Sequence, residues 1–275
     1  MSPPITRYVD AAGRKCRVWE KGSGPTIYWL ASTPLLYRWT AIHEALSAQC
    51  RLVVLSLPGM AGNSRNHDDL DDHLSWCLAA RDLLEAAGFE DGDTLMGSST
   101  AGALAADVAA LWPDFVGRLI LVAPHGLFID AEPTRDMFAL HPRKAAELMS
   151  AKPDVYKEQI AVPEGMEPVM WTIETARSNE ATARFLWPLG NTRVAQRLGR
   201  ITATTLILWG TEDQIIPPSY ADHFAKGMGN RASVQRIPDA GHVAELDQPE
   251  AIAKAVLAFA SQSSTSRPNL VAAAS

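Results

Sequence analysis

The sequence has few cysteines, no excess of basic charge and no long apolar run, and each absence excludes a class of protein. Its 275 residues include only three widely separated cysteines, so we expect no disulfide framework and a reducing, cytoplasmic setting. The formal charge of −6 leaves no basic surface for binding phosphates, so nucleic acid is not an expected partner. No run approaches the roughly 18 apolar residues of a membrane span, so no membrane partner is expected.

Signals for cofactors and for export are also missing. No His or Cys cluster shows metal-ligand spacing and no glycine-rich phosphate loop follows a strand, so we expect neither a metal nor another cofactor. The first four residues lack the basic start and apolar stretch of a secretory signal, which again favours the cytoplasm. Segment 262–275, rich in Ser and Ala, is predicted to be a flexible tail. The oligomeric state stays open, with a homodimer as one option.

Most of the chain alternates short β-rich apolar runs with segments of helical periodicity. Residues 5–20 alternate around a turn at 11–13, as an antiparallel hairpin does. Alternating strands and helices after this hairpin predict an α/β fold, with a mostly parallel, eight-stranded sheet flanked by helices. The predicted strands are 26–30, 52–57, 94–96, 119–122, 204–209 and 233–237, and the predicted helices are about 37–49, 74–87, 99–111, 219–226 and 249–260.

One stretch departs from this alternation. Residues 127–198 resemble several helices separated by prolines, and they contain no convincing strand. We therefore expect a helical cap at 127–198, inserted into a core that is formed by residues 1–126 and 199–261.

Segment 94–103 runs from a short strand into a helix of small residues and carries a serine at the turn. When a serine sits on a strained strand-to-helix turn, the residues two before and two after it must be small. Gly97 and Ala101 meet this demand around Ser99, whereas a turn centred on Ser98 would be flanked by larger side chains. Taken alone, the two serines could equally cap the helix.

Two polar turns follow later strands and complete the pattern. In segment 206–217 an apolar strand ends in a glycine turn, and Asp213 stands three residues after Gly210. In segment 237–245 a strand ends in a Gly-His turn that carries His242. Alone, these two residues would be more typical of a turn aspartate and a solvated loop histidine. Serine, acid and histidine on successive strand ends, in this order, are typical of a nucleophile with its orienting acid and its base.

A serine hydroxyl is a weak nucleophile until an adjacent imidazole takes its proton, and a carboxylate holds that imidazole in the productive tautomer. Together with a Pro-Gly loop at 56–64, these motifs resemble the α/β-hydrolase family over about residues 20–260. The nearest resemblance is to small bacterial meta-cleavage-product hydrolases and esterases. It implies the α/β-hydrolase fold, with Ser99 as nucleophile, His242 as general base and Asp213 as the acid that orients the histidine.

The resemblance also implies an oxyanion hole, with one departure from the family pattern. A His-Gly pair follows the third strand in the family, whereas this chain has Ala31 and Ser32 after residues 26–30. By register, the backbone N–H groups of Thr33 and Thr100 would bind the oxyanion, and backbone donors do not depend on side-chain type. The Ser32 and Thr33 hydroxyls could add a donor or contact the substrate.

Further side chains are candidates for substrate contact. His125 follows a predicted strand, and catalytic groups gather at the carboxyl ends of parallel strands. Three aromatic residues of the expected cap could line a pocket, although aromatic residues at helical spacing are often simple core. The substrate-contact candidates are Ser32, His125, Trp171, Phe185 and Trp187.

These features predict an enzyme whose partner is a small-molecule substrate. We expect hydrolysis of a small or medium carboxylic ester, lactone or thioester, or of a C–C bond, through an acyl-enzyme. The altered loop after the third strand would also permit a non-hydrolytic lyase or a biosynthetic cyclase. A third alternative is a ligand-binding protein with slow turnover. The sequence does not choose the substrate, because the cap shapes the pocket.

Overall fold

An N-terminal hairpin and six further strands form one eight-stranded sheet in the computed structural model, which describes residues 2–188 and 190–262. The strand order is β1-β2-β4-β3-β5-β6-β7-β8. Only the β1–β2 and β2–β4 pairs are antiparallel. The predicted mostly parallel, eight-stranded sheet is therefore confirmed. The strands are β1 (Ile5–Ala11), β2 (Arg14–Lys21), β3 (Thr26–Leu30), β4 (Arg51–Leu55), β5 (Asp93–Ser98), β6 (Val116–Val122), β7 (Thr204–Gly210) and β8 (Ala232–Ile237).

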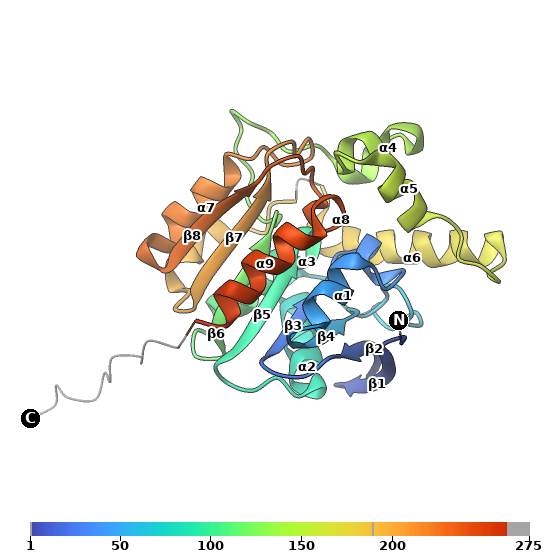
Figure 1. Ribbon diagram of the computed structural model, residues 1–275, viewed down its shortest axis with the longest axis horizontal. Helices are drawn as coiled ribbons and strands as arrows, with labels where there is room; N and C mark the ends of the chain where they lie inside the picture. Colours follow the sequence, from blue (N-terminus) through green and yellow to red (C-terminus); the bar gives the residue numbers. More distant parts are fainter. Residues whose placement is uncertain (1, 189, 263–275) are drawn as a thin grey trace, which may run out of the picture.

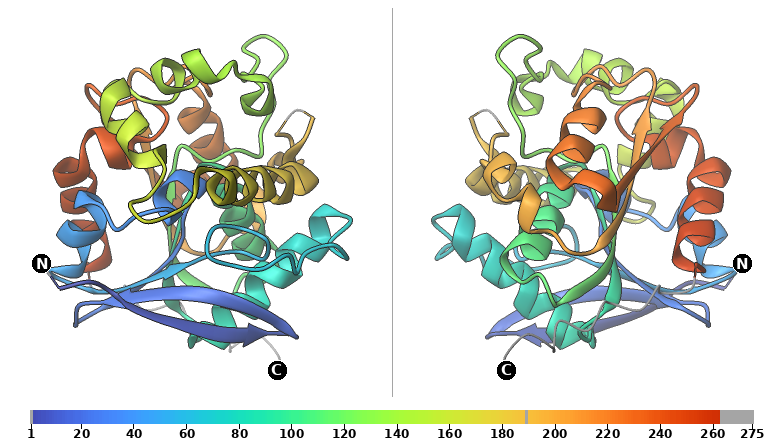
Figure 2. Two further views of the ribbon diagram at one scale, coloured as in Figure 1. Left: turned by 90° about the vertical axis from the view of Figure 1, so that its right-hand side faces the viewer. Right: turned by 90° about the vertical axis from the view of Figure 1, so that its left-hand side faces the viewer.

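Helices cover both faces of the sheet, and α1 and α9 pack together on one face with α2, α3 and α7 on the other (Figure 2). Helix α3 starts at the carboxyl end of β5 and is buried along almost its whole length. Its alanines and glycine let it approach the sheet closely, which places its first turn at the centre of the molecule. Outside the chain between β6 and β7, the helices are α1 (Ala41–Ser47), α2 (His73–Ala87), α3 (Ser99–Leu111), α7 (Tyr220–Met228), α8 (Ala244–Asp247) and α9 (Pro249–Ala260).

The chain between β6 and β7 contains three helices above the carboxyl edge of the sheet (Figure 1). These are α4 (Pro142–Met149), α5 (Pro153–Ile160) and α6 (Pro168–Leu186). Each begins with proline, which suits a first helical turn because the N–H that proline lacks would have no partner there. The described part of this interval contains no strand. Its role as a separate cap stays a prediction. Short 3₁₀ turns lie at Thr33–Leu36 (η1), Met137–Ala139 (η2), Val194–Gln196 (η3), Leu198–Arg200 (η4) and Gly229–Arg231 (η5).

Two local features differ from the sequence expectation. The helix predicted from about residue 37 begins at Ala41, because residues 33–36 form η1 and Thr40 caps α1. The Thr40 backbone N–H donates to His43 Nδ1 at 3.1 Å, which satisfies a donor at the helix start. Helix α8 was not predicted. Of the predicted tail 262–275, residues 263–275 lie outside the described part of the chain. Among the helices of residues 2–188 and 190–262, none is long and apolar enough to cross a membrane.

Candidate active site

Ser99 occupies the sharp turn between β5 and α3. Its φ of 48° lies in the left-handed region, which is unfavourable for a residue with a side chain. A Cβ at Gly97 would lie 2.4 Å from the Ala105 Cβ and 2.9 Å from the Gly102 Cα, so only glycine fits there. Ala101 is fully buried on the other side of the turn. Glycine is therefore sterically required at position 97, and the small Ala101 occupies a fully buried position.

Ser99, His242 and Asp213 form one continuous chain of hydrogen bonds. The Ser99 Oγ lies 2.7 Å from His242 Nε2, and His242 Nδ1 lies 2.9 Å from Asp213 Oδ2. All three residues are buried, with exposed fractions of 3%, 1% and 6% for Ser99, His242 and Asp213. The structure thus brings together the three residues that were far apart in the sequence.

The Asp213 carboxylate is held in a single orientation. Its Oδ1 accepts from the backbone N–H groups of Ile215 at 2.8 Å and Ile216 at 2.9 Å, and its Oδ2 accepts from Trp209 Nε1 at 3.0 Å. With the His242 contact, four donors converge on two oxygens. The carboxylate therefore cannot rotate away from the imidazole without breaking several bonds.

The turns that carry Asp213 and His242 also pack directly against each other. A Cβ at Gly210 would lie 2.2 Å from the Gly241 carbonyl oxygen, so β7 must end in glycine. The Glu212 N–H donates to the Ala240 carbonyl at 2.9 Å. These backbone contacts align the acid with the histidine before any substrate binds.

Ser99 opens onto a cavity of about 640 Å³ between the sheet edge and helices α4–α6. Ser32, Thr33 and Thr100 lie beside Ser99 in its lining. Most of the remaining wall is apolar or aromatic, which is typical of a site for a small organic molecule. The wall includes Pro34, Tyr37, Met137, Phe138, Leu140, Ala145, Met149, Tyr156, Ile160, Trp171, Thr175, Asn179, Glu180, Thr182 and Ala183.

Hydrogen-bond donors suitable for an oxyanion lie next to Ser99. Thr33 and Thr100 stand in the first turns of η1 and α3, where backbone N–H groups have no partner within the helix. The Ser32 hydroxyl is buried, lines the same cavity and has no hydrogen-bond partner. All three groups predicted around the oxyanion hole therefore lie at this end of the cavity.

The cavity wall carries little charge, and that charge is negative. Among the described lining residues, Glu180 alone carries a formal charge, and its carboxylate is bound by His67 Nε2 at 2.6 Å and Arg184 Nε at 2.5 Å. Burial raises the pKa of Tyr156 to about 12 and also raises that of Tyr37, so both phenols stay neutral at physiological pH.

Of the three aromatic residues predicted to contact the substrate, one lines the cavity and two do not. Trp171 lines the cavity, whereas Phe185 packs on Trp76 with ring centroids 5.0 Å apart. Trp187 is 62% exposed and is not part of the cavity wall, so its prediction is wrong. Helix α6 ends at Leu186, and the extended backbone of Trp187 (φ −69°, ψ 144°) takes its side chain off the helical face.

His125 is adjacent to the triad but faces a smaller neighbouring cavity, which is lined also by Phe128 and Leu186. Its backbone N–H donates to the Ser99 carbonyl at 3.0 Å, and its ring lies edge-on to that of His242, with centroids 5.4 Å apart. Burial lowers the pKa of His125 well below its usual range. A neutral imidazole here shields one side of His242 from water.

Two buried acids near the triad were missed by the sequence reasoning. Glu245 lies on α8, three residues after His242, and is fully buried. Burial raises the pKa of its carboxyl to about 7. Its carboxyl interacts with the Ser98 hydroxyl, which also accepts from Trp29 Nε1 at 2.7 Å. Asp247, also on α8, is fully buried as well. Charged residues after a loop histidine are normally exposed, so their types alone carried no signal.

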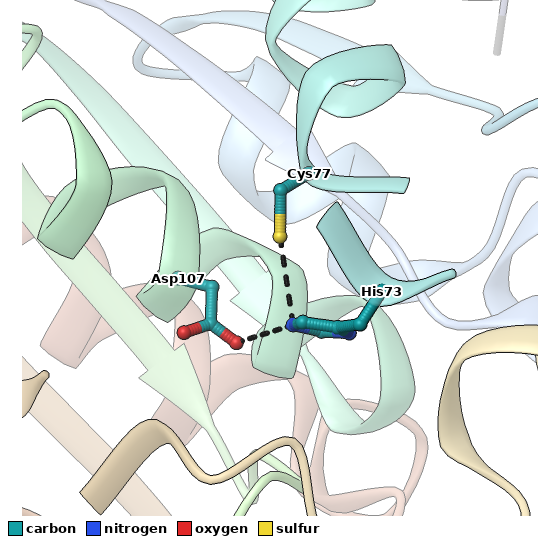
Figure 3. Close-up of side chains that lie close together, drawn as sticks. All are labelled: His73, Cys77 and Asp107. Carbon is teal, nitrogen blue, oxygen red and sulfur yellow. Dashed lines mark hydrogen bonds and ion pairs between the residues drawn. The ribbon is translucent and has the colours of Figure 1, made fainter. Parts of the chain in front are cut away.

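A cluster of possible metal ligands lies between α2 and α3, where His73 and Cys77 of α2 face Asp107 of α3 (Figure 3). His73 Nε2 is 2.7 Å from Asp107 Oδ2 and 3.5 Å from Cys77 Sγ. His73 and Cys77 stand four residues apart on one helix, a spacing that the expectation of no metal-ligand cluster did not include. Asp107 already accepts from Thr192 Oγ1 at 2.9 Å and Arg197 Nε at 2.7 Å. Burial also raises the pKa of the Cys77 thiol, which disfavours the thiolate that a metal needs. The cluster is an ion-pair network.

A serine on a sharp strand-to-helix turn, a Ser-His-Asp hydrogen-bond chain and an eight-stranded, mostly parallel sheet together define one class of protein. The model of the alpha/beta hydrolase family matches residues 22–255, so the chain belongs to that family. The resemblance found in the sequence is thereby confirmed.

Three known proteins illustrate the similarity. The chain is 28% identical to the dihydrolipoyllysine-residue acetyltransferase component of an acetoin cleaving system from Pseudomonas putida, over 93% of this chain and 69% of that protein. It is 26% identical to human monoacylglycerol lipase ABHD6, over 80% and 70% of the two chains. Its fold is similar to that of a meta-cleavage product hydrolase from Pseudomonas fluorescens IP01, with a TM-score of 0.73, 18% identity, and 92% and 96% of the two chains covered.

Proposed function

We propose that this protein is a serine esterase that hydrolyses small or medium neutral carboxylic esters through an acyl-enzyme. The observation that carries the proposal is the buried chain from Ser99 Oγ through His242 to Asp213 at the floor of an apolar cavity. Esters are preferred to lactones and thioesters as the simplest substrates that this cavity admits. The names of two relatives, an acetyltransferase component and a monoacylglycerol lipase, also refer to acyl chemistry.

The geometry supports the following steps. Ser99 Oγ attacks the ester carbonyl while His242 Nε2 accepts its proton, and Asp213 stabilises the resulting imidazolium. The backbone N–H groups of Thr33 and Thr100 bind the negative oxygen of the tetrahedral intermediate. The imidazolium then protonates the leaving alkoxide, which gives the alcohol and the acyl-enzyme. Water, deprotonated by His242, attacks the acyl carbonyl and releases the acid together with free Ser99.

The helices above the sheet set the acyl-group preference in this proposal. We propose that residues 127–198 act as the cap, because α4, α5 and α6 each contribute apolar side chains to the cavity wall. A volume of about 640 Å³ has room for an acyl chain of medium length. No lysine or arginine occurs among the described lining residues, so a carboxylate on the substrate would lack a partner there.

Labelling with a fluorophosphonate probe tests this function. We expect the purified protein to be labelled at Ser99, as mapped by mass spectrometry, and to hydrolyse p-nitrophenyl acetate and butyrate. Ser99→Ala should lose both labelling and turnover. Ser98→Ala is the matched control, since it removes the adjacent hydroxyl and should leave the labelling site unchanged. Folded wild-type protein with neither labelling nor turnover would refute the proposal.

A further inference from the structure

One carboxylate binds the turn that carries His242 to the chain between α4 and α5. Asp247 Oδ2 accepts from the Gly241 N–H at 2.7 Å and from the Ala151 N–H at 2.9 Å. Its Oδ1 accepts from the Ser150 hydroxyl and from the Lys152 N–H, the latter at 3.3 Å. Because Asp247 is fully buried, water does not compete for these bonds.

The same two segments also touch through their backbones. The Val243 N–H donates to the Met149 carbonyl at 2.9 Å. A Cβ at Gly241 would lie 2.9 Å from the Ala151 nitrogen and 3.0 Å from the Ser150 Cα, so glycine is needed for this approach. We call residues 149–152 the α4–α5 junction. The junction and the histidine turn are therefore in direct contact through backbone hydrogen bonds, a close backbone approach and the Asp247 carboxylate.

The junction in turn meets the cavity above Ser99. Met149, its first residue, is part of the cavity wall, and so is Tyr156 on α5 just after it. A substrate group that presses on these side chains therefore acts on the segment whose hydrogen bonds hold the histidine turn.

We propose that Asp247 is a positioning residue that couples the filling of the cavity to the alignment of His242 with Ser99. This inference rests on the proposed esterase function. Displacements of about 1 Å in a reacting group can cost about a hundredfold in rate, so a small shift of the histidine turn is enough to change turnover. An acyl group long enough to reach Met149 stabilises the aligned state, whereas an acetyl group does not.

The kinetic test compares Asp247→Asn with wild type on p-nitrophenyl acetate, butyrate and hexanoate. For the wild type we expect kcat to rise and KM to fall as the acyl chain becomes longer. In the variant, kcat for hexanoate falls about tenfold and approaches that for acetate, while KM still falls with chain length. A purely structural role would lower kcat for all three esters by one common factor, and that result would overturn the proposal. A wild-type kcat that does not depend on acyl length would overturn it as well.

Two further variants complete the design. Asp222→Asn is the matched control, because this exposed carboxylate on α7 pairs with Arg236 and should leave all constants unchanged. Ser150→Ala removes one bond to Asp247 from the opposite side and should reduce the acyl-length dependence of kcat in the same direction. If Asp247→Asn does not fold, Ser150→Ala decides the question.

Hydrogen–deuterium exchange gives a measurement independent of turnover. In Ser150→Ala, amides of 241–243 should exchange faster than in wild type, although the altered residue lies elsewhere in the sequence. Unchanged exchange at 241–243 would refute the coupling. A wild type that lacks both turnover and Ser99 labelling would refute the esterase proposal instead, and the exchange data would still decide whether the junction holds the histidine turn.

Discussion

The left-handed backbone of Ser99 costs about 1–3 kcal/mol and persists only where the surrounding structure enforces it. Here the enforcement comes from close contacts at Gly97 and Gly102, so the strain is distributed over the packing of β5 against α3. The result is a hydroxyl that projects into the cavity within hydrogen-bond distance of His242. This local arrangement explains why small residues matter on both sides of the serine.

Ser32 allows a test of the oxyanion hole that does not alter the backbone. Its buried hydroxyl lines the cavity without a hydrogen-bond partner, so it is available as a third donor to the oxyanion. We expect Ser32→Ala to lower kcat about tenfold or more with little change in KM, because the bond forms mainly in the transition state. Steady-state kinetics with p-nitrophenyl butyrate measures this. Ser233→Ala, exposed on β8, is the control, and an increase in KM at constant kcat would assign Ser32 to ground-state binding instead.

Glu245 makes the stability of the protein depend on pH. Its folded-state pKa of about 7 exceeds the ordinary value of 4.5. The unfolded chain therefore releases this proton first, and the group's contribution to stability, complete below about pH 4.5, is lost as pH rises through 7. Between pH 5 and pH 8, we expect the melting temperature of the wild type to fall further than that of Glu245→Gln. Thermal unfolding at both pH values, with exposed Glu250→Gln as control, measures this; parallel losses in wild type and Glu245→Gln would contradict it.

The hydrogen-bonded set of Ser99, His242 and Asp213 could be predicted at this scale because each member has a local sequence signature: small residues around Ser99, a glycine turn before Asp213 and a Gly-His turn at His242. Asp247 and Glu245 could not. Their importance comes from burial and from partners that are distant in the sequence, Ser150 for Asp247 and Ser98 for Glu245, and a single sequence does not show which distant segments meet.

The strands were predicted well because a strand covered on both faces is a continuous apolar run bounded by turn residues. The ends of the helices between β6 and β7 were harder to predict than the strands. Its helical content could be predicted from proline spacing, but the exposed position of Trp187 depends on where α6 ends. Helix ends are set by capping and tertiary contacts more than by periodicity.

Asp107 links three elements, since it binds His73 of α2, sits on α3 itself, and holds Arg197 just before η4. Its side chain is fully buried and that of Arg197 is 24% exposed. Asp107→Asn would leave the guanidinium without its counter-charge, so we expect a loss of about 3 kcal/mol in the free energy of unfolding. Urea unfolding measures this. The exposed Asp222→Asn should cost less than about 1 kcal/mol, and an equally small effect at Asp107 would contradict the network.

The same network makes a prediction about metals. Because hydrogen bonds from His73, Thr192 and Arg197 already occupy Asp107, the cluster should not require an ion. We expect the melting temperature to be unchanged after dialysis against EDTA and after addition of zinc. A rise in melting temperature with zinc that Cys77→Ser abolishes would instead identify a metal site.

Over the whole molecule, the charge distribution disfavours anionic substrates at two distances. The net charge of −6 repels anions at long range, an effect that salt screens beyond about 10 Å. Within the cavity, Glu180 carries the one formal charge among the described lining residues. A substrate carboxylate bound there would lose its hydration without gaining a cationic partner from the cavity wall. The second effect acts inside the site and is screened much less.

A set of three esters of equal chain length separates these effects. We compare p-nitrophenyl valerate with the mono-p-nitrophenyl esters of glutaric acid and of glutaramic acid, which end in a methyl group, a carboxylate and a neutral amide. The expected kcat/KM for the carboxylate is about a hundredfold below that for valerate, mainly through KM, and the amide lies between them. Adding 0.5 M salt should recover less than threefold, because the larger part arises inside the cavity. Equal rates for the carboxylate-terminated ester and for p-nitrophenyl valerate would mean that a cation reaches the bound acyl group, and the preference for neutral esters would then be wrong.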